Sequence, residues 1–328
     1  MYKKIQKIVF LYHPKARMWG SVRARVIQMA TLVTETLIES GFDVSVKSDT
    51  SGIRDALVVV HKTMIGPSTV NKMAALKLRN CVLVADPIDG KFSAKDFSIY
   101  DAVISASFAQ MEWLTKALPG KNSYFVNQRL DQRFPLYTGS EKDTLRIGYF
   151  GASENCAHKD SLTGRIDLIE TPTDSTRWMN RLLDYSMHYA VRPKNDSIFK
   201  PFGKGYIAGR YSCPIIVGYD EPDGIHLLPE DYPFWVDSSD LESISYVIEK
   251  AESQFNSDMW RYARDTLENV ATLATDQNIT HQMSVMISEL LGGRKFVSKT
   301  YLPEIIAKNY FYRGVVLYSR IVRKIKSA

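Results

Sequence analysis

Short apolar runs alternate with longer amphipathic segments through the first part of the chain. The runs place Val, Ile and Leu on consecutive positions, which is typical of strands buried on both faces of a parallel sheet. The segments between them repeat apolar residues at helical spacing. An alternation of this kind predicts an α/β domain in which helices cover a parallel sheet. The predicted strands are residues 8–12, 42–47, 56–60, 81–85, 102–105 and 123–126, and the predicted helices are residues 22–40, 69–78 and 108–117.

A polar stretch at residues 138–144 follows this domain and has the composition of a linker. Beyond it the alternation resumes, first with a strand that starts at Arg146 and leads into a turn at Gly151. The further predicted elements are strands at residues 187–191 and 214–217, helices at residues 175–184, 241–252 and 257–273, and a helix that begins at Pro201. We therefore predict two α/β domains, residues 1–144 and 145–292, and a separate tail, residues 293–328.

The overall composition agrees with a folded protein of two domains. The chain has 328 residues, of which 45% are hydrophobic and 24% charged, and these proportions are ordinary for globular proteins. Its three cysteines are widely spaced and include no Cys-x-x-Cys pair, which argues against a disulfide framework and against a zinc site. The start of the chain lacks the apolar core of a signal peptide, and no run of 18 apolar residues occurs. We expect a cytoplasmic protein.

The segment from residue 192 to residue 221 combines cations and glycines at a predicted helix start. Arg192, Lys200 and Lys204 supply positive charge, and Gly203 and Gly205 stand where the helix begins. Glycine lets a ligand approach the backbone closely, and the free amides at a helix N-terminus carry partial positive charge. The Arg192 guanidinium is suited to bidentate contact with phosphate oxygens. The segment therefore predicts a binding site for a phosphate or diphosphate.

Two structural interpretations of the same segment stay open at this stage. The lysines can be solvated surface residues of an ordinary strand-helix unit, and Arg192 can pair with Asp196 or Asp220 instead of holding a ligand. The separate glycine turn at Gly151, at the end of the strand that opens the second domain, favours the binding site. Two such signals in the right order are more specific than either alone.

The cationic segment resembles the donor-binding segment of GT-B glycosyltransferases, in which a Lys opens a helix, small residues follow and a Pro begins the next strand. The matching residues are Lys204, Ala208 and Pro214, with Asp220 and Glu221 in the loop beyond the strand. The resemblance implies two Rossmann-like domains that face a cleft. It also implies that a nucleotide-sugar donor is held in the second domain by Gly151, Arg192, Lys200, Gly203, Lys204, Gly205 and Glu221.

The chain departs from this family at one pair of positions. Many retaining members carry two Glu residues eight apart in the segment, where this chain has Phe199 and Ile207. The resemblance therefore carries over the diphosphate site but not the Glu pair that holds the sugar and the ribose. This absence leaves a non-catalytic relative as an alternative.

Candidate bases for an acceptor hydroxyl follow the predicted strands of the first domain. His61, Asp86 and Asp89 come directly after strands, and ligands of such sheets bind at the carboxyl ends of the strands. Each of them can remove a proton from an acceptor hydroxyl, and His13 ranks below them. The alternative for each is a turn or capping role, since Asp-Pro and Asp-Gly are themselves turn dipeptides.

Positive charge is concentrated in the tail. Residues 294–328 contain nine Lys or Arg residues and one acidic residue, and apolar residues recur among them at nearly helical spacing. The resemblance to GT-B enzymes implies that a basic amphipathic helix of this kind, up to about Leu317, packs back on the first domain. The last basic turns are predicted to lie on an anionic membrane surface, over residues 313–328, or to bind a partner copy. Because the chain has no recognisable nucleic-acid-binding motif, we expect no nucleic-acid partner.

Together these features and the resemblance predict a glycosyltransferase that moves a sugar from a nucleotide-sugar to a glycan or glycolipid acceptor, in surface polysaccharide synthesis. No cofactor and no essential metal are expected, because Arg192, Lys204 and helix amides would neutralise the leaving diphosphate. The expected location is the cytoplasm or the inner face of the membrane. The alternative is a non-catalytic GT-B-like scaffold that binds a membrane or a partner through its basic tail.

Overall fold

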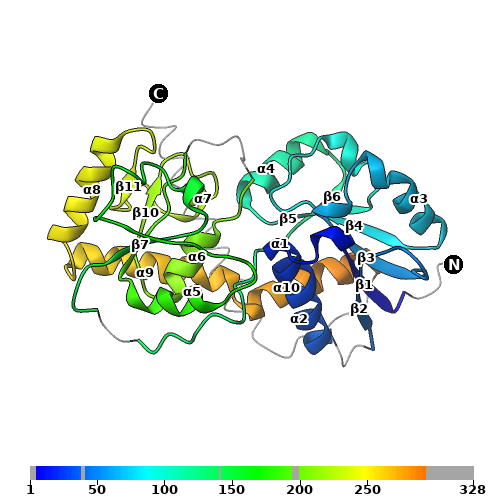
Figure 1. The fold of residues 1–328 in the computed structure, drawn as a ribbon. Helices are drawn as coiled ribbons and strands as arrows, with labels where there is room; N and C mark the ends of the chain where they lie inside the picture. Colours follow the sequence, from blue (N-terminus) through cyan, green and yellow to red (C-terminus); the bar gives the residue numbers. More distant parts are fainter. Residues whose placement is uncertain (1–4, 38–40, 140–141, 194–198, 293–328) are drawn as a thin grey trace. The chain divides into compact units, whose positions relative to one another are not determined.

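The computed structural model describes residues 5–37, 41–139, 142–193 and 199–292. Residues up to Met286 form one compact unit, which contains two separate sheets of parallel strands (Figure 1). The predicted basic tail, residues 293–328, and its membrane segment, residues 313–328, lie outside the described residues. None of the described helices is both long and apolar enough to cross a membrane.

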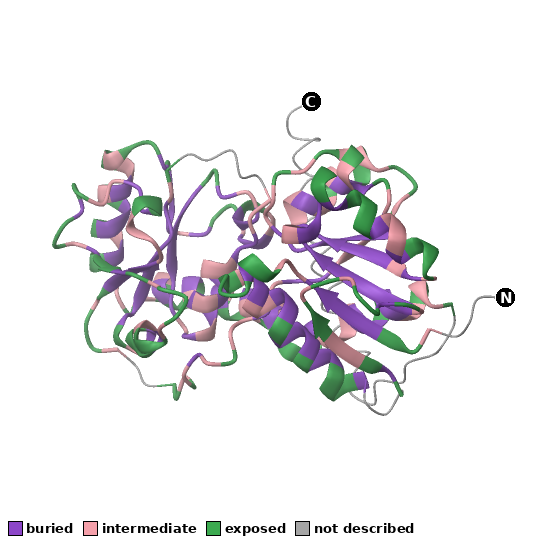
Figure 2. Cartoon of the chain, turned by 45° about the vertical axis from the view of Figure 1, so that its right-hand side comes forward, coloured by how far each residue is buried: buried purple, intermediate pink, exposed green. Residues whose placement is uncertain are grey.

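Six strands form the first sheet, in the order β2-β1-β3-β4-β5-β6. All six residues of β3 are buried, and the central strands of this sheet are mostly purple in Figure 2, as the continuous apolar runs predicted. The two edge strands, β2 and β6, contain no buried residue. The strands are β1 Lys7–Leu11, β2 Asp43–Lys47, β3 Ala56–His61, β4 Val82–Asp86, β5 Ala102–Ser105 and β6 Asn122–Phe125. The helices are α1 Gly20–Val22, α2 Gln28–Leu37, α3 Val70–Leu78 and α4 Phe108–Ala117, and a π-helical turn, Arg23–Ile27, joins α1 to α2.

Five strands form the second sheet, in the order β11-β10-β9-β7-β8. They are β7 Ile147–Phe150, β8 Asp167–Ile169, β9 Met187–Tyr189, β10 Ile215–Gly218 and β11 Trp235–Val236. The helices of this part are α5 Arg177–Asn180, α6 Gly203–Arg210, α7 Gly224–Leu227, α8 Leu241–Ser253, α9 Asp258–Ala271 and α10 Asp276–Leu290. The predicted fold class, two α/β sheets with flanking helices, is confirmed, whereas the predicted domain boundaries stay predictions.

Several elements of the second half, among them β8 and α10, do not appear in the sequence prediction. The strand β8 has three residues, of which two are exposed, so it shows neither an apolar run nor a clear alternation. The helix α10 returns to the end of the first sheet, where the main-chain N–H of Asn127 donates to Gln282 at 2.8 Å. The guanidinium of Arg129 also pairs with Asp276, the first residue of α10. Residues just after β6 are thus held by the last described helix.

Close packing of α6 against α9 fixes the helix that carries the predicted phosphate-binding residues. A Cβ atom on Gly209 would lie 1.9 Å from the main-chain oxygen of Leu267. Only glycine fits there, because the α9 backbone occupies the space that a side chain would need. The helix α6 therefore lies directly on α9, and its first turn is held at the edge of the second sheet.

Candidate functional site

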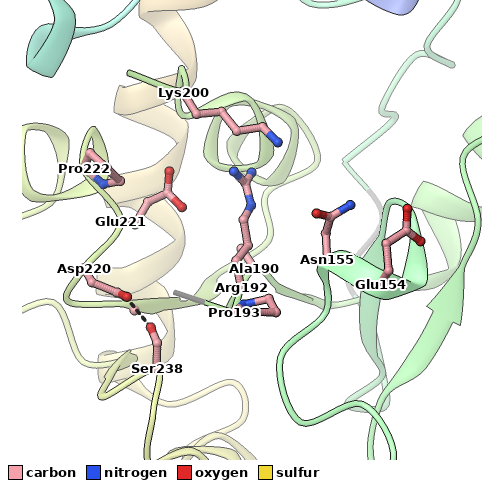
Figure 3. A pocket seen from close by; sticks show the side chains of 11 residues that line it. Glu154, Asn155, Ala190, Arg192, Pro193, Lys200, Asp220, Glu221, Pro222 and Ser238 are labelled. Atoms are coloured by element: carbon pink, nitrogen blue, oxygen red, sulfur yellow. Dashed lines mark hydrogen bonds between the residues drawn. The ribbon is translucent and has the colours of Figure 1, made fainter. Parts of the chain in front are cut away.

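A cavity of about 240 Å³ opens at the carboxyl edge of the second sheet (Figure 3). Four of the parallel strands end there, so their following loops meet at one edge. The strand β7 precedes both of its neighbours, β8 and β9, which makes this edge the point where the strand order reverses. Ligands of open α/β sheets bind at such points. The lining includes Glu154 and Asn155 after β7, Arg192 after β9, Lys200 before α6, Asp220 and Glu221 after β10, and Ser238 after β11.

Two cations point into the same part of this cavity. The guanidinium of Arg192 and the ammonium of Lys200 face one another in Figure 3. Burial lowers the pKa of Lys200, and the neighbouring charge of Arg192 lowers it further. Like charges held this close repel one another, and a bound anion would relieve that repulsion. The part of the cavity between these two cations can therefore accept negative charge.

A third basic residue, Lys204, lies in the first turn of α6, close enough to Arg192 and Lys200 for their charges to act on it. Its Nζ is buried and has no hydrogen-bond partner among the described residues, and it lies 3.3 Å from the centre of the Tyr149 ring. Burial places the pKa of Lys204 well below its ordinary value, and the charge of Arg192 adds to this effect. The ring stabilises the cation only partly, because a cation-π contact replaces few of the hydrogen bonds that water supplies.

Two neighbouring acids in the cavity, Asp220 and Glu221, differ in their hydrogen bonding. Asp220 accepts a hydrogen bond from the hydroxyl of Ser238, drawn as the dashed line in Figure 3. Glu221 is buried, and its Oε1 has no partner among the described residues. Burial raises the pKa of Glu221, against the opposing charges of Arg192 and Lys200. Glu221 is therefore the acid that is available to bind hydroxyl groups of a ligand.

The predicted glycines lie around the cavity but do not line it. The helix α6 begins at Gly203, two residues after the predicted start at Pro201. A Cβ on Gly205 would lie 2.0 Å from the Phe202 ring, so packing alone requires glycine there, whereas a Cβ on Gly203 would have room. Gly151 has a φ of +154° and donates its N–H to Ile169. Of the predicted donor-site residues, the cavity lining thus includes Arg192, Lys200 and Glu221.

Asp86, a predicted base, lies in a buried ion pair at the end of β4. The Nε and Nη2 of Arg25 donate to its two carboxylate oxygens at 3.0 and 3.1 Å. The Nη1 of Arg25 donates to the carbonyls of Val126 and Asn127 at 3.0 and 2.7 Å. This network ties the π-helical turn to β4 and to the chain after β6. The contacts of Asp86 in this structure are those of a structural residue.

The other two predicted bases differ in exposure. His61 pairs in register with the end of β4; its Nδ1 lies 2.9 Å from the Thr63 hydroxyl, and its Nε2 is buried without a described partner. Burial lowers the pKa of His61 to about 4. Asp89 has a side chain that is 29% exposed and pairs with Lys62. Burial alone would raise the pKa of Asp89, but the positive charges of Lys62 and Lys200 lower it by more, so the pKa of Asp89 is below its ordinary value.

Arg25 and Asp223 are among the buried charged residues that sequence reasoning missed. Arg25 stands among the apolar residues of an amphipathic segment, and this position in the sequence already indicates that its side chain is buried. Asp223 is fully buried and accepts main-chain N–H bonds from Phe108 at 2.7 Å and Phe202 at 3.2 Å. Burial raises the pKa of Asp223 to about 7, against the effect of these two bonds. The acid thus joins the first turn of α4 to the residue before α6, a contact between distant segments that no local pattern reveals.

Two parallel sheets, each with helices and with a reversal of strand order, define the GT-B fold. A glycosyltransferase from Rickettsia africae superposes with a TM-score of 0.62 at 11% identity, over 89% of this chain and 100% of that one. Sucrose-phosphate synthase from Thermosynechococcus elongatus gives 0.59 at 10% identity, over 87% and 99%. HepE of Anabaena, solved in complex with UDP and glucose, gives 0.58 at 10% identity, over 87% and 100%. No protein-family model and no curated protein matches the sequence. The chain has the GT-B fold.

Proposed function

We propose that this chain is a glycosyltransferase that takes a sugar from a nucleotide-sugar donor. The observation that carries the proposal is the group of three cations, Arg192, Lys200 and Lys204, at the strand reversal of the second sheet. Two of them line the cavity, and the third is buried with no hydrogen-bond partner among the described residues. A diphosphate placed there would satisfy all three. Glu221 would then bind hydroxyl groups of the ribose or the sugar.

The same cations support a reaction without an essential metal. Transfer of the sugar breaks its bond to the diphosphate and leaves negative charge on the leaving group. Preorganised cations in a partly buried site stabilise such charge strongly, because little water remains to screen it. We propose that Arg192, Lys200 and Lys204 perform this role. Donor binding and transfer should then persist in the presence of EDTA.

For the acceptor we propose Asp89 as the residue that removes the hydroxyl proton. It is the most accessible of the three predicted bases, and Lys62 holds its carboxylate in the charged form that can accept a proton. The acceptor class that we propose is a glycan or glycolipid of surface polysaccharide synthesis. An Asp89→Asn variant should bind the donor as the wild type does and lose transfer. Donor binding in the wild type without any transfer would instead favour the non-catalytic scaffold.

A thermal-shift screen of nucleoside diphosphates and nucleotide-sugars tests the donor site, beginning with UDP. A ligand at 100 times its Kd adds about 2.7 kcal/mol to the free energy of unfolding. We expect this shift to vanish in Lys204→Met, which keeps an apolar chain of similar length over the Tyr149 ring. Lys116→Ala is the control, because it removes an exposed lysine from α4. A folded Lys204→Met variant with an undiminished shift would contradict the proposal.

A further inference from the structure

An exposed apolar surface follows the first strand. Met18 is 59% exposed, Trp19 52% and Ile27 42%. The N–H of Arg23 donates to the carbonyl of Trp19 at 3.1 Å, and helical structure continues through Ile27. Residues four apart in a helix share a face, so Trp19, Arg23 and Ile27 lie along one side. The opposite side is already buried at Val22, and the outward apolar residues are therefore not needed for the core.

The charged side chains of the segment that carries this surface are all positive. The first 34 residues contain seven Lys or Arg residues and no Asp or Glu. Arg25 is neutralised by Asp86 in the core, whereas Lys15, Arg17 and Arg23 form no ion pair within the described part of the chain. Lys15 and Arg17 are exposed. We call the group Lys15, Arg17, Met18, Trp19, Arg23 and Ile27 the basic aromatic face.

The basic aromatic face begins at the carboxyl edge of the first sheet. The N–H of His13, two residues after β1, donates to the hydroxyl of Thr63, two residues after β3, at 3.1 Å. The end of β3 is also in register with the end of β4. The exposed residues thus follow directly on the edge at which Asp89 stands, where an acceptor would approach.

We propose that the basic aromatic face docks the chain on an anionic lipid bilayer. Trp prefers the headgroup level of a membrane, Met and Ile insert below it, and cations above it attract anionic headgroups. A neutral glycan would instead be held by both donors and acceptors around the ring, whereas the charged side chains of this face are donors only. The proposal that this face binds a membrane does not depend on the proposed sugar transfer. Its consequence, that the acceptor is carried by a lipid, rests on the proposed function.

Vesicle co-sedimentation with the full chain tests the docking. Vesicles of phosphatidylcholine mixed with phosphatidylglycerol should bind the protein, and pure phosphatidylcholine should bind it much more weakly. Each cation near an anionic surface strengthens binding about fivefold, so Arg17→Gln/Arg23→Gln should bind about 30-fold more weakly. Trp19→Ser should bind roughly tenfold more weakly. Tyr246→Ser removes an exposed aromatic residue from α8 and should change nothing.

Three outcomes would overturn the docking: no binding to anionic vesicles, equal binding to neutral ones, or unchanged binding of both face variants. The last result would assign the membrane contact to another part of the chain. Sedimentation velocity without lipid tests whether the basic aromatic face instead binds a second copy of the chain. A dimer that dissociates in Trp19→Ser would make this face an interface between copies. Thermal melting of each variant checks that it is folded. The nucleotide screen uses no lipid, so failure of the donor site and failure of the docking are separate results.

Discussion

The ion pair between Arg25 and Asp86 predicts a large loss of stability when one partner alone is neutralised. Their side chains are 2% and 3% exposed, and the guanidinium makes four hydrogen bonds, two to Asp86 and one each to the carbonyls of Val126 and Asn127. An Asp86→Asn variant keeps the shape but leaves the Arg25 charge buried without its counterion. Breaking a buried pair in this way costs about 3–5 kcal/mol. Because whole domains are stable by only about 5–15 kcal/mol, the loss should be roughly a fifth or more of the total.

Equilibrium unfolding in urea, followed by circular dichroism, measures this loss. With an m-value of about 3 kcal/mol per M, the midpoint of Asp86→Asn should fall by roughly 1 M or more. The matched control is Asp184→Asn, since Asp184 pairs with Arg181 at the same 3.0 Å but both side chains are over 40% exposed. An exposed pair contributes about 1 kcal/mol or less. The two substitutions thus make the same chemical change at different burial.

Equal midpoints for Asp86→Asn and Asp184→Asn would refute this reasoning. The double variant Arg25→Met/Asp86→Leu adds a second test, because it removes both charges. It should recover part of the loss, and only part, since the carbonyls of Val126 and Asn127 then lack their donor. A well-folded Asp86→Asn variant that binds nucleotide but fails to transfer sugar would return Asp86 to the candidate bases.

Three further predictions follow from burial and packing. Asp223 binds a proton in the folded state up to about pH 7 and in the unfolded state only to about pH 4, so folding takes up a proton between these values. The contribution of Asp223 therefore favours folding at low pH and falls by about 4 kcal/mol as the pH rises to 7. Stability measured by melting at several pH values should fall more steeply with pH in the wild type than in Asp223→Asn. The same dependence of stability on pH in both proteins would contradict this. Gly209→Ala should cost about 3 kcal/mol in urea unfolding, because its Cβ meets the Leu267 carbonyl, whereas Gly203→Ala has room and should cost far less. Nucleoside diphosphate binding should raise the lowered pKa of Lys204, because a bound anion favours its charged form, and protons should be taken up at pH values between the free and the bound pKa; calorimetric heats that do not depend on the ionisation enthalpy of the buffer at any pH would contradict this.

Most strands could be predicted from the sequence because they are buried on both faces. The run from residue 56 to residue 60 has five consecutive apolar residues, and β3 occupies Ala56–His61. Helix starts were predictable where a capping residue is present, as at Asp240, whose carboxylate accepts the N–H groups of Glu242 and Ser243. The same local rules placed Arg192 after β9, at the edge where the cavity lies.

Contacts between distant segments could not be predicted, because they produce no periodic pattern of residue types in the sequence. The partner of Arg25 is 61 residues away, and the N–H groups that Asp223 accepts come from two different helix starts. Lys204 was predicted to face a diphosphate, but its stacking on Tyr149 depends on how β7 and α6 meet in space. The sequence thus indicated which residues carry charge, and the structure shows which of those charges are already paired.

That difference in pairing separates the structural charges of this chain from the functional candidates. Arg25 is buried, and the fold supplies one carboxylate and two carbonyls as acceptors for its hydrogen bonds. A buried cation with a structural role is thus fully paired within the chain. Lys204 is also buried, yet it has an aromatic ring and no hydrogen-bond acceptor among the described residues, and Glu221 nearby keeps an unpaired oxygen. Each unpaired buried group costs about 1–3 kcal/mol. Glu221 lines the cavity at the edge where sheets of this kind bind ligands, and the charges of Arg192, Lys200 and Glu221 act on Lys204. A ligand with both anionic and hydroxyl groups would offset the cost of leaving Lys204 and Glu221 unpaired.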